Sequence, residues 1–364
     1  MIGKFVLYAP NIHTGGGFVL LQALLGAWPQ SVASTVFLDA RARGRLQAPF
    51  GANASWVRAT VASRLKAELA LRSAADADCT VLCFHDLPPL LPSLARVVVF
   101  QQNKNHLGLG SLAAFGWRTR LRLIFERTAS RMFRHRVTEY LVQTPSMRRA
   151  LIQWYGADLH GQLPAVRILP FVDTLFDAPE GNAKPAEWDF VYVADGEAHK
   201  NHLVLLAAWR LLAQDGLHPS LALTLTPRDT ALRHAVAYQS QQAGLRIVDL
   251  GQLPHARVLS LYMTAGALIF PSISESFGLP LVEASRVGLP ILASELDYVR
   301  DVCTPAQTFD PASAVSIARA VKRFLKWPEP TLKLRSPQEF WQELLGQLPD
   351  EHVGAMQGAG PDGH

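Results

Sequence analysis

The sequence predicts an α/β protein with two doubly wound domains, each built on a parallel sheet covered by helices. Short runs of Val, Ile and Leu lack strict alternation, as is typical of parallel strands buried on both faces. Longer helical patterns separate these runs throughout the chain, which favours Rossmann-like domains. The segment Ala178–Glu187 is rich in Pro, Gly and small residues, lacks apolar periodicity, and divides the chain into two nearly equal halves.

In the first half we expect strands at Lys4–Tyr8, Ser34–Leu38, Thr80–Phe84, Val97–Phe100 and Tyr140–Gln143. In the second half we expect them at Phe190–Val193, Ala222–Leu225, Arg246–Asp249, Ala267–Phe270 and Pro290–Ala293. Clear helical patterns lie at Gly17–Ala27, Thr119–Arg134 and Leu203–Ala213. We therefore place one domain at residues 1–178 and the other at 188–330, followed by a helical segment at 331–346 and a disordered tail at 347–364.

Composition excludes several classes of protein. The 364 residues are 49% hydrophobic and 18% charged, which suits two domains with real cores and not a disordered chain. Three cysteines without paired spacing predict neither a disulfide framework nor a zinc site, so a reducing cytosol is expected. The first residues are predicted to form a strand and not a signal peptide, and no apolar run approaches the roughly 20 residues of a membrane span.

Positive charge is concentrated in the first half of the chain. Residues 1–177 contain 20 Lys and Arg against 10 Asp and Glu, whereas residues 178–364 contain 15 against 20. Such asymmetry indicates that the first half meets an anionic partner.

The strongest local signal is Ala267–Pro290, where a strand leads through a loop into a helix that starts near Pro280. Backbone N–H groups at the helix start would form an anion site. Glu275 precedes the helix and Glu283 lies in its first turns, so one carboxylate can reach a sugar hydroxyl and the other a ribose diol. Spacing alone supports a capped helix with two surface glutamates equally well.

This segment resembles the E-x7-E signature of retaining glycosyltransferases of family 4, which have the GT-B fold of two Rossmann-like domains facing across a cleft. Glu275 and Glu283 stand at the two Glu positions, and the following Gly288-Leu289-Pro290 and Ser294-Glu295 also look like that family. The resemblance covers roughly residues 80–325. It implies that Glu275 contacts the transferred sugar and that Glu283 binds the nucleotide ribose. It also implies that the 331–346 helix returns to the first domain. It further implies that the intervening residues hold the donor; these are Ser276, Phe277, Gly278 and Leu279.

A second strand–loop–helix pattern covers Phe190–Leu206, with Lys200 at the helix start. The resemblance implies that an Arg and a Lys grip the donor diphosphate here. Lys200 matches the lysine, but Asp195 stands at the arginine position and cannot do that work. Without the family, a solvated lysine would be the preferred interpretation.

Glycines follow the first strand in Asn11–Gly17, but they do not form the GxGxxG dinucleotide fingerprint. A plain tight turn would explain them, since glycine permits positive φ. The resemblance implies instead that Gly15 and Gly16 face the donor diphosphate.

Polar residues also end the strand in Val97–Gly108. The family usually has a His near this position, where the chain has Gln102 and Asn103, with His106 further on. Upstream, FHDLPP at Phe84–Pro89 is similar to a strand-end motif that accompanies such a QN pair in bacterial surface-polysaccharide transferases. We expect Gln102 and Asn103 to be catalytic and His106 to contact the acceptor, with His85 a weaker candidate. The alternative is that these residues only cap strands.

The stretch Phe115–Arg136 interleaves arginines, among them Arg118, Arg120 and Arg122, with aromatic residues. A basic amphipathic helix of this kind can lie on an anionic membrane. It could equally be RNA-binding or an ordinary solvated face. The charge asymmetry favours the membrane.

Together these patterns predict a retaining hexosyltransferase that uses a nucleotide-sugar donor, with no cofactor, metal or nucleic acid. The expected acceptor is a glycan, a polyprenyl-linked acceptor or a lipid-A-linked acceptor. The expected process is bacterial lipopolysaccharide, O-antigen or exopolysaccharide synthesis. The expected location is the cytoplasm, peripheral to the inner face of the plasma membrane. A catalytically weak GT-B scaffold, suggested by Asp195 and Gln102, and a basic RNA-binding protein remain as alternatives. A GT-B epimerase or phosphorylase lacks support from motifs.

Overall fold

The structure is a computed structural model that describes residues 4–28, 34–49, 51–109, 112, 116–156, 161–172, 186–328 and 336–337. The predicted tail at 347–364, almost all of the 331–346 helix and most of the segment Ala178–Glu187 lie outside these residues. The described residues up to Phe324 belong to one compact unit, which contains two separate parallel sheets.

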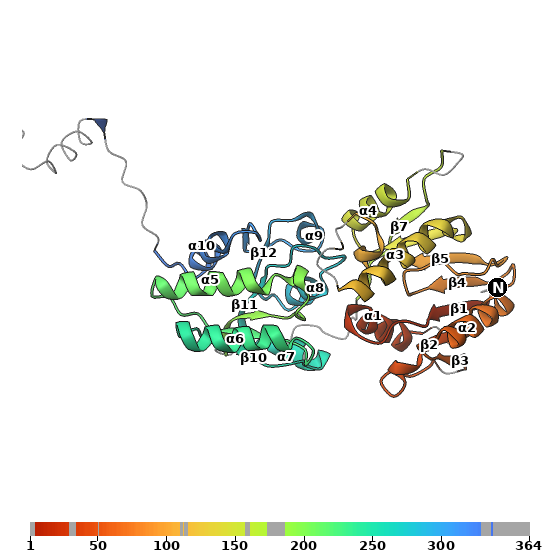
Figure 1. Ribbon diagram of the computed structural model, residues 1–364, viewed down its shortest axis with the longest axis horizontal. Coiled ribbons are helices and arrows are strands. Elements are labelled where there is room, and N and C mark those ends of the chain that lie inside the picture. Colours follow the sequence, from red (N-terminus) through yellow and green to blue (C-terminus); the bar gives the residue numbers. More distant parts are fainter. Residues whose placement is uncertain are drawn as a thin grey trace, which may run out of the picture. The chain divides into compact units, whose positions relative to one another are not determined.

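The first sheet has seven parallel strands in the order β3-β2-β1-β4-β5-β6-β7 (Figure 1). They are β1 (Phe5–Ala9), β2 (Ser34–Asp39), β3 (Asn53–Val57), β4 (Thr80–Cys83), β5 (Arg96–Phe100), β6 (Glu139–Val142) and β7 (Val166–Ile168). All five strands expected from the sequence are present, with ends shifted by one residue. Strands β3 and β7 were not expected, because Asn53 and Ser55 interrupt the apolar residues of β3 and because β7 has only three residues.

Helices cover both faces of this sheet. They are α1 (Gly15–Gly26), α2 (Val61–Ala74), α3 (Trp117–Met132) and α4 (Pro145–Tyr155). On β1, Val6 and Tyr8 belong to one core cluster with residues of α2 and α4, while Leu7 and Ala9 belong to another with residues of α1. Alternate residues of one strand are thus buried on opposite faces, which explains the continuous apolar runs in the sequence.

The second sheet has six parallel strands in the order β10-β9-β8-β11-β12-β13. They are β8 (Trp188–Tyr192), β9 (Leu221–Leu223), β10 (Ile247–Asp249), β11 (Ala265–Phe270), β12 (Ile291–Ser294) and β13 (Gln307–Phe309). The five expected strands are again present, and β13 is additional. The strand order confirms the predicted fold of two doubly wound Rossmann-like domains.

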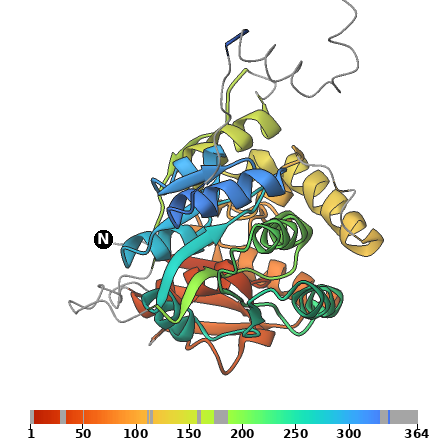
Figure 2. The ribbon, with the colours of Figure 1, turned by 90° about the vertical axis from the view of Figure 1, so that its left-hand side faces the viewer.

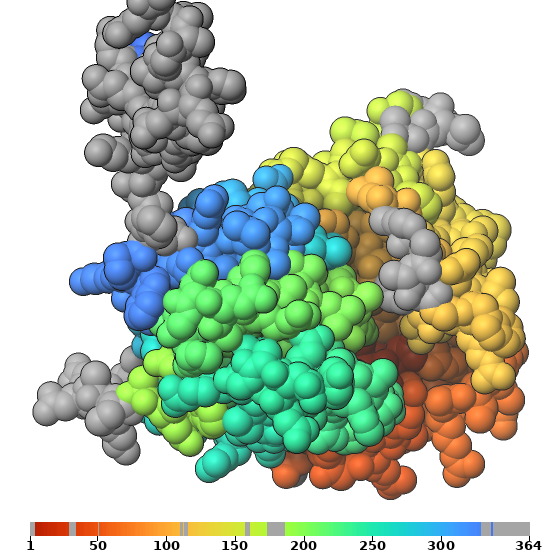
Figure 3. All heavy atoms as spheres, turned by 60° about the vertical axis from the view of Figure 1, so that its left-hand side comes forward, coloured from red at the N-terminus to blue at the C-terminus, as the bar shows by residue number. Residues whose placement is uncertain are grey.

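Six helices follow the strands of the second sheet. They are α5 (His202–Gln214), α6 (Thr230–Ala243), α7 (His255–Met263), α8 (Leu279–Arg286), α9 (Asp297–Arg300) and α10 (Ala314–Phe324). Helices α5 and α6 lie side by side, as the green and blue-green surfaces of Figure 3 show. No helix among the described residues is long and apolar enough to cross a membrane.

Strand order determines where ligands can bind. In each sheet the order reverses at one point, between β1 and β4 and between β8 and β11. Loops that leave neighbouring strands in opposite directions at such a point open a crevice at the carboxyl ends. The loop with Lys200 follows β8, and the loop with Glu275 follows β11, so the topology brings these two sequence motifs together.

Candidate active site

Lys200 and Glu275 form an ion pair, with 2.7 Å between Nζ and Oε1. The loops that carry them are joined by backbone contacts, because the His199 carbonyl accepts hydrogen bonds from Ile273 N at 2.9 Å and from Ser272 Oγ at 3.1 Å. Their side chains are only 17% and 12% exposed. A pair held this firmly places a cation and a carboxylate together at the switch point of the second sheet.

The backbone before α8 supplies uncapped amide groups. Gly278 is the N-cap of α8, has φ of 72°, and no side chain caps the first turn. The N–H groups of such a turn point outward and favour an anion. Phe277 is buried, and Leu279 lines the adjacent pocket. Ser276 Oγ accepts a hydrogen bond from Lys104 N in the first domain at 2.7 Å, and donor binding by Ser276 remains a prediction.

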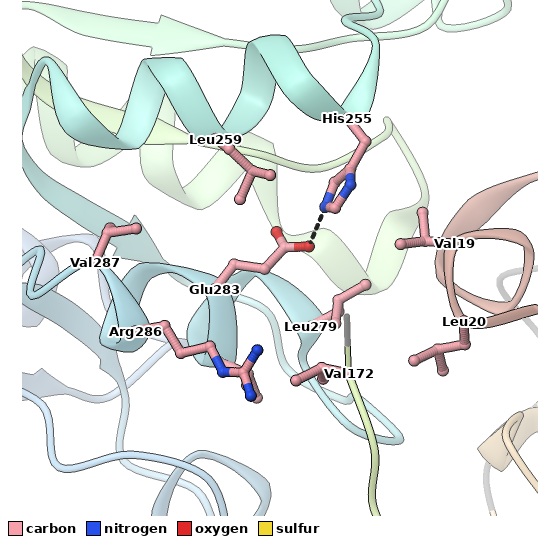
Figure 4. Close-up of a pocket in the computed structure, with 10 residues that line it drawn as sticks. Val19, Leu20, Val172, His255, Leu259, Leu279, Glu283, Arg286 and Val287 are labelled. Atoms are coloured by element: carbon pink, nitrogen blue, oxygen red, sulfur yellow. Dashed lines mark hydrogen bonds and ion pairs between the residues drawn. The ribbon is translucent and has the colours of Figure 1, made fainter. Parts of the chain in front are cut away.

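Glu283 is held by two partners that the sequence analysis did not identify. Its Oε1 lies 2.7 Å from His255 Nε2, and Tyr262 donates its hydroxyl hydrogen to Oε2 at 3.3 Å. Figure 4 shows His255 and Glu283 pointing toward each other in a pocket that Val19 and Leu20 of the first domain also line. Neither partner stands in a motif, and only the packing of α7 beside α8 reveals them.

Replacing His255 with Ala should weaken nucleoside-diphosphate binding about tenfold, because Glu283, which the resemblance assigns to the ribose, loses the partner that orients its carboxylate. Calorimetric titration of the ribonucleotide and of its 2′-deoxy analogue measures this. The variant should lose discrimination between the two, whereas an indirect structural effect would weaken both equally. His234, on the neighbouring helix α6, is the control position.

The glycine loop of the first domain meets both the second domain and Gln102. Helix α1 begins at Gly15, whose φ is 71°, and Thr14 makes no capping hydrogen bond to it. A Cβ at Gly16 would lie 3.9 Å from Leu279 Cδ2, and one at Gly17 would lie 3.3 Å from Gln102 Oε1. Gly15 and Gly16 therefore present open amide groups next to the α8 side of the pocket.

Asp86 organises the Gln102–Asn103 segment. Its Oδ1 accepts hydrogen bonds from the backbone N–H groups of both residues, at 3.0 Å for Asn103. Gln102 Nε2 donates to the Phe84 carbonyl at 2.8 Å, and among the described residues its buried Oε1 has no hydrogen-bond partner. An unsatisfied buried acceptor in a crevice is a candidate ligand contact. Asp86 lies in the FHDLPP motif at Phe84–Pro89, next to the sequence candidate His85.

His106 lies between two carboxylates instead of facing an open surface. Its Nδ1 is 3.6 Å from Asp86 Oδ2, and its Nε2 is 3.4 Å from Glu126 Oε2. Burial alone would lower the pKa of His106, but Glu126 and Asp86 outweigh it and raise that pKa. The nearby His85 has its pKa lowered to about 3, by burial and by the charge of Arg64. The His106 side chain thus contacts Asp86 and Glu126 within the domain. Contact between His106 and the acceptor remains a prediction.

The His106 cluster predicts a pH-dependent stability. A histidine whose pKa is raised on folding stabilises the protein fully below its unfolded pKa, near 6.5, and loses that contribution as pH rises through the folded value. His106→Gln should therefore lower the free energy of unfolding more at pH 6 than at pH 9. Urea titrations at both pH values check this. An equal loss at both would show that His106 is neutral in the folded protein.

The loop after β8 lacks the arginine that the resemblance implies for binding the diphosphate. Asp195 instead accepts a hydrogen bond through its carbonyl from His202 Nε2 at 2.7 Å. Burial, together with the charge of Asp195, raises the pKa of Glu197 in the same loop. Lys200 is thus the cation of this loop that faces the crevice. The described residues contain no group of three His, Cys, Asp or Glu side chains that could hold a metal, and the predicted metal independence remains a prediction.

The two sheets define the fold. Two parallel-sheet Rossmann-like domains of this strand order have the GT-B architecture. HepE from Anabaena, solved with UDP-glucose, matches with a TM-score of 0.63 at 15% identity, over 89% of this chain and 90% of that one. This likeness shows the fold.

Sequence comparisons relate the second half of the chain to one family of enzymes. Residues 174–337 match the family model described as "Glycosyl transferases group 1". The mannosyltransferase WbdA of Escherichia coli is 28% identical over 193 residues, which cover 51% of this chain and 22% of WbdA. The O-antigen chain mannosyltransferase B of Escherichia coli is 29% identical over 127 residues, covering 31% and 30% respectively. The chain thus spans less than a third of these curated relatives. The second half of the chain is therefore similar to group 1 glycosyltransferases over residues 174–337.

Proposed function

We propose that the protein transfers a hexose-type sugar, with retention of configuration, from a nucleotide-sugar donor to a glycan or lipid-linked acceptor in surface-polysaccharide synthesis. The observation that carries the proposal is the Lys200–Glu275 pair beside the uncapped start of α8, with Glu283 in the adjoining pocket. Relatives named as mannosyltransferases, one of them for O-antigen, support this substrate class.

Each group of the site has a role in this reaction. Lys200, the amides before α8 and the Gly15–Gly16 loop stabilise the charge that develops on the leaving diphosphate. The Glu283 carboxylate accepts hydrogen bonds from the ribose hydroxyls. The Glu275 carboxylate accepts a hydrogen bond from a hydroxyl of the transferred sugar once the Lys200 side chain turns to the phosphate. Retention then needs no glutamate nucleophile, because the acceptor oxygen bonds to the anomeric carbon on the face from which the diphosphate leaves. The leaving phosphate takes the acceptor proton.

A thermal-shift panel of UDP-, GDP-, dTDP- and ADP-sugars tests the donor assignment, since a ligand that binds only the folded state raises the melting temperature. One donor should stabilise the protein and be slowly hydrolysed without acceptor. Stabilisation without hydrolysis or transfer would favour a nucleotide-binding scaffold. No stabilisation by any nucleotide, combined with steeply salt-dependent RNA binding, would favour the RNA-binding alternative.

Helix α3 supports membrane association in this proposal. It carries Arg118, Arg120 and Arg122 beside exposed apolar side chains, with Trp117 67% and Phe125 69% exposed. Figure 2 shows the helix, in yellow, at the periphery of the ribbon. Its opposite face buries Leu123 and Ala129. An apolar stripe flanked by arginines on the solvent side suits an anionic bilayer surface, where the acceptor would be carried.

The wild-type protein should sediment with anionic liposomes at low salt, and added salt should weaken this because the attraction is screened. Arg122 pairs with Glu126 of the buried cluster, so Trp117→Ser with Phe125→Ser is a cleaner disruption than reversing that arginine. This double variant should stay in the supernatant and still bind nucleotide. Leu65→Ser with Leu69→Ser, exposed on α2, is the matched control. Wild-type protein that fails to sediment would leave α3 as a solvated face.

A further inference from the structure

Two arginines from separate elements converge on the loop that precedes α1. Arg45, in the turn after β2, donates from Nη2 to the His13 carbonyl at 2.6 Å. Arg64, in the first turns of α2, donates to the side-chain oxygen of Asn11. The loop follows β1 directly and ends at Gly15, so both guanidinium groups lie at the carboxyl edge of the first sheet.

Neither arginine has a carboxylate partner among the described residues. Elsewhere in the same domain, Arg41 pairs with the buried Asp39 at 2.6 Å, and Arg96 pairs with Glu139 at 2.7 Å. Arg45 and Arg64 instead bond to neutral oxygens, and Arg45 also lies over the Phe18 ring at 4.7 Å. Their positive charges are therefore not neutralised by the fold.

Nearby carboxylates have other partners. Asp39 accepts hydrogen bonds from Arg41, and Glu68 accepts them from the Tyr8 hydroxyl at 2.9 Å and from Leu90 N at 2.8 Å. The excess positive charge thus remains on Arg45 and Arg64, the two arginines that contact the loop. A guanidinium has five N–H donors in a planar fork, and each of these hydrogen bonds uses one terminal nitrogen.

We propose that Arg45 and Arg64 form a binding site for a phosphate group of the acceptor. This inference rests on the proposed function. The proposed function places the donor at Lys200 and α8, and the inference therefore places the acceptor at the carboxyl end of β1. A phosphate has enough oxygens to accept forked hydrogen bonds from two guanidinium groups at once, whereas a carboxylate has two. The loop that both arginines contact leads directly into Gly15, the first residue of α1.

Calorimetry with inorganic phosphate, on protein saturated with the nucleoside diphosphate that binds best, isolates this site from the donor site. Arg45→Gln with Arg64→Gln keeps an amide that can bond to the neutral loop oxygens and removes both charges. This variant should weaken phosphate binding at least about tenfold and leave nucleotide binding unchanged. Arg72→Gln, on the last turn of α2, should match the wild type. Unchanged phosphate binding would overturn the proposal, as would a matching loss of nucleotide binding, which would assign the arginines to the donor.

Turnover with three acceptors then identifies the source of the phosphate. The three acceptors are derivatives of the same sugar: its methyl glycoside, its phosphate and its short-chain polyprenyl diphosphate. Wild-type protein should prefer the phosphorylated forms, and the double Gln variant should lose that preference. Equal use of the two phosphorylated forms indicates a soluble sugar phosphate, and preference for the polyprenyl form indicates a lipid carrier. Preference for the neutral glycoside would overturn the proposal, while absence of donor binding would instead count against the glycosyltransferase assignment.

Discussion

Replacing Glu275 with Gln is expected to lower the transfer rate by about 10²–10³, the usual cost of removing one polar group that acts on the transition state. The substitution keeps the shape of the side chain and removes its charge. Lys200, now without its 2.7 Å partner, should hold a diphosphate as well as before or better. The rate should therefore fall while the dissociation constant of the nucleoside diphosphate stays the same or decreases.

This divergence between rate and binding separates a role in chemistry from damage to the fold. Glu295→Gln, at an exposed glutamate that pairs with Arg300, is the matched control and should keep wild-type turnover. Glu283→Gln should also remove most activity, but through weaker nucleotide binding, because Glu283 lines the pocket that we propose for the ribose. Near-wild-type turnover in both the Glu275 and Glu283 variants would remove the central proposal.

Replacing Lys200 with Ala is expected to raise the dissociation constant of the nucleoside diphosphate about tenfold to a hundredfold. A charge-assisted hydrogen bond contributes about 1.5–3 kcal/mol, and in this loop Asp195 stands where the resemblance places a second cation. The variant also leaves the Glu275 carboxylate, 12% exposed, without its ion-pair partner, so the free energy of unfolding should fall.

Asp195→Arg in the Lys200→Ala background should recover part of the nucleotide affinity if the two positions share the diphosphate. Lys66→Ala, at an exposed lysine on α2, is the control for loss of positive charge. Unchanged affinity in the Lys200→Ala variant would place the diphosphate elsewhere, with Arg45 and Arg64 the first positions to examine.

The sequence by itself determined the fold class and the local motifs. Runs of Val, Ile and Leu without alternation predicted parallel strands, and β1 indeed buries alternate residues on opposite faces. The strand–loop–helix around Glu275 was also predictable, because its strand, loop and helix start are contiguous in the chain. Strands β3, β7 and β13 were not predictable. Strands β7 and β13 have only three residues each, and β3 has no continuous apolar run because Asn53 and Ser55 interrupt it.

Only the tertiary structure decided which side chains meet. Lys200 and Glu275 are 75 residues apart, His255 and Glu283 are 28 apart, and Arg45 and His13 are 32 apart. The first contact requires β8 and β11 to be neighbours, although β9 and β10 lie between them in sequence. No local pattern encodes such a contact, because it depends on the packing of whole strands and helices. The motifs therefore identified Glu275 and Glu283, and the packing revealed Asp86, His255 and the two arginines of the first domain.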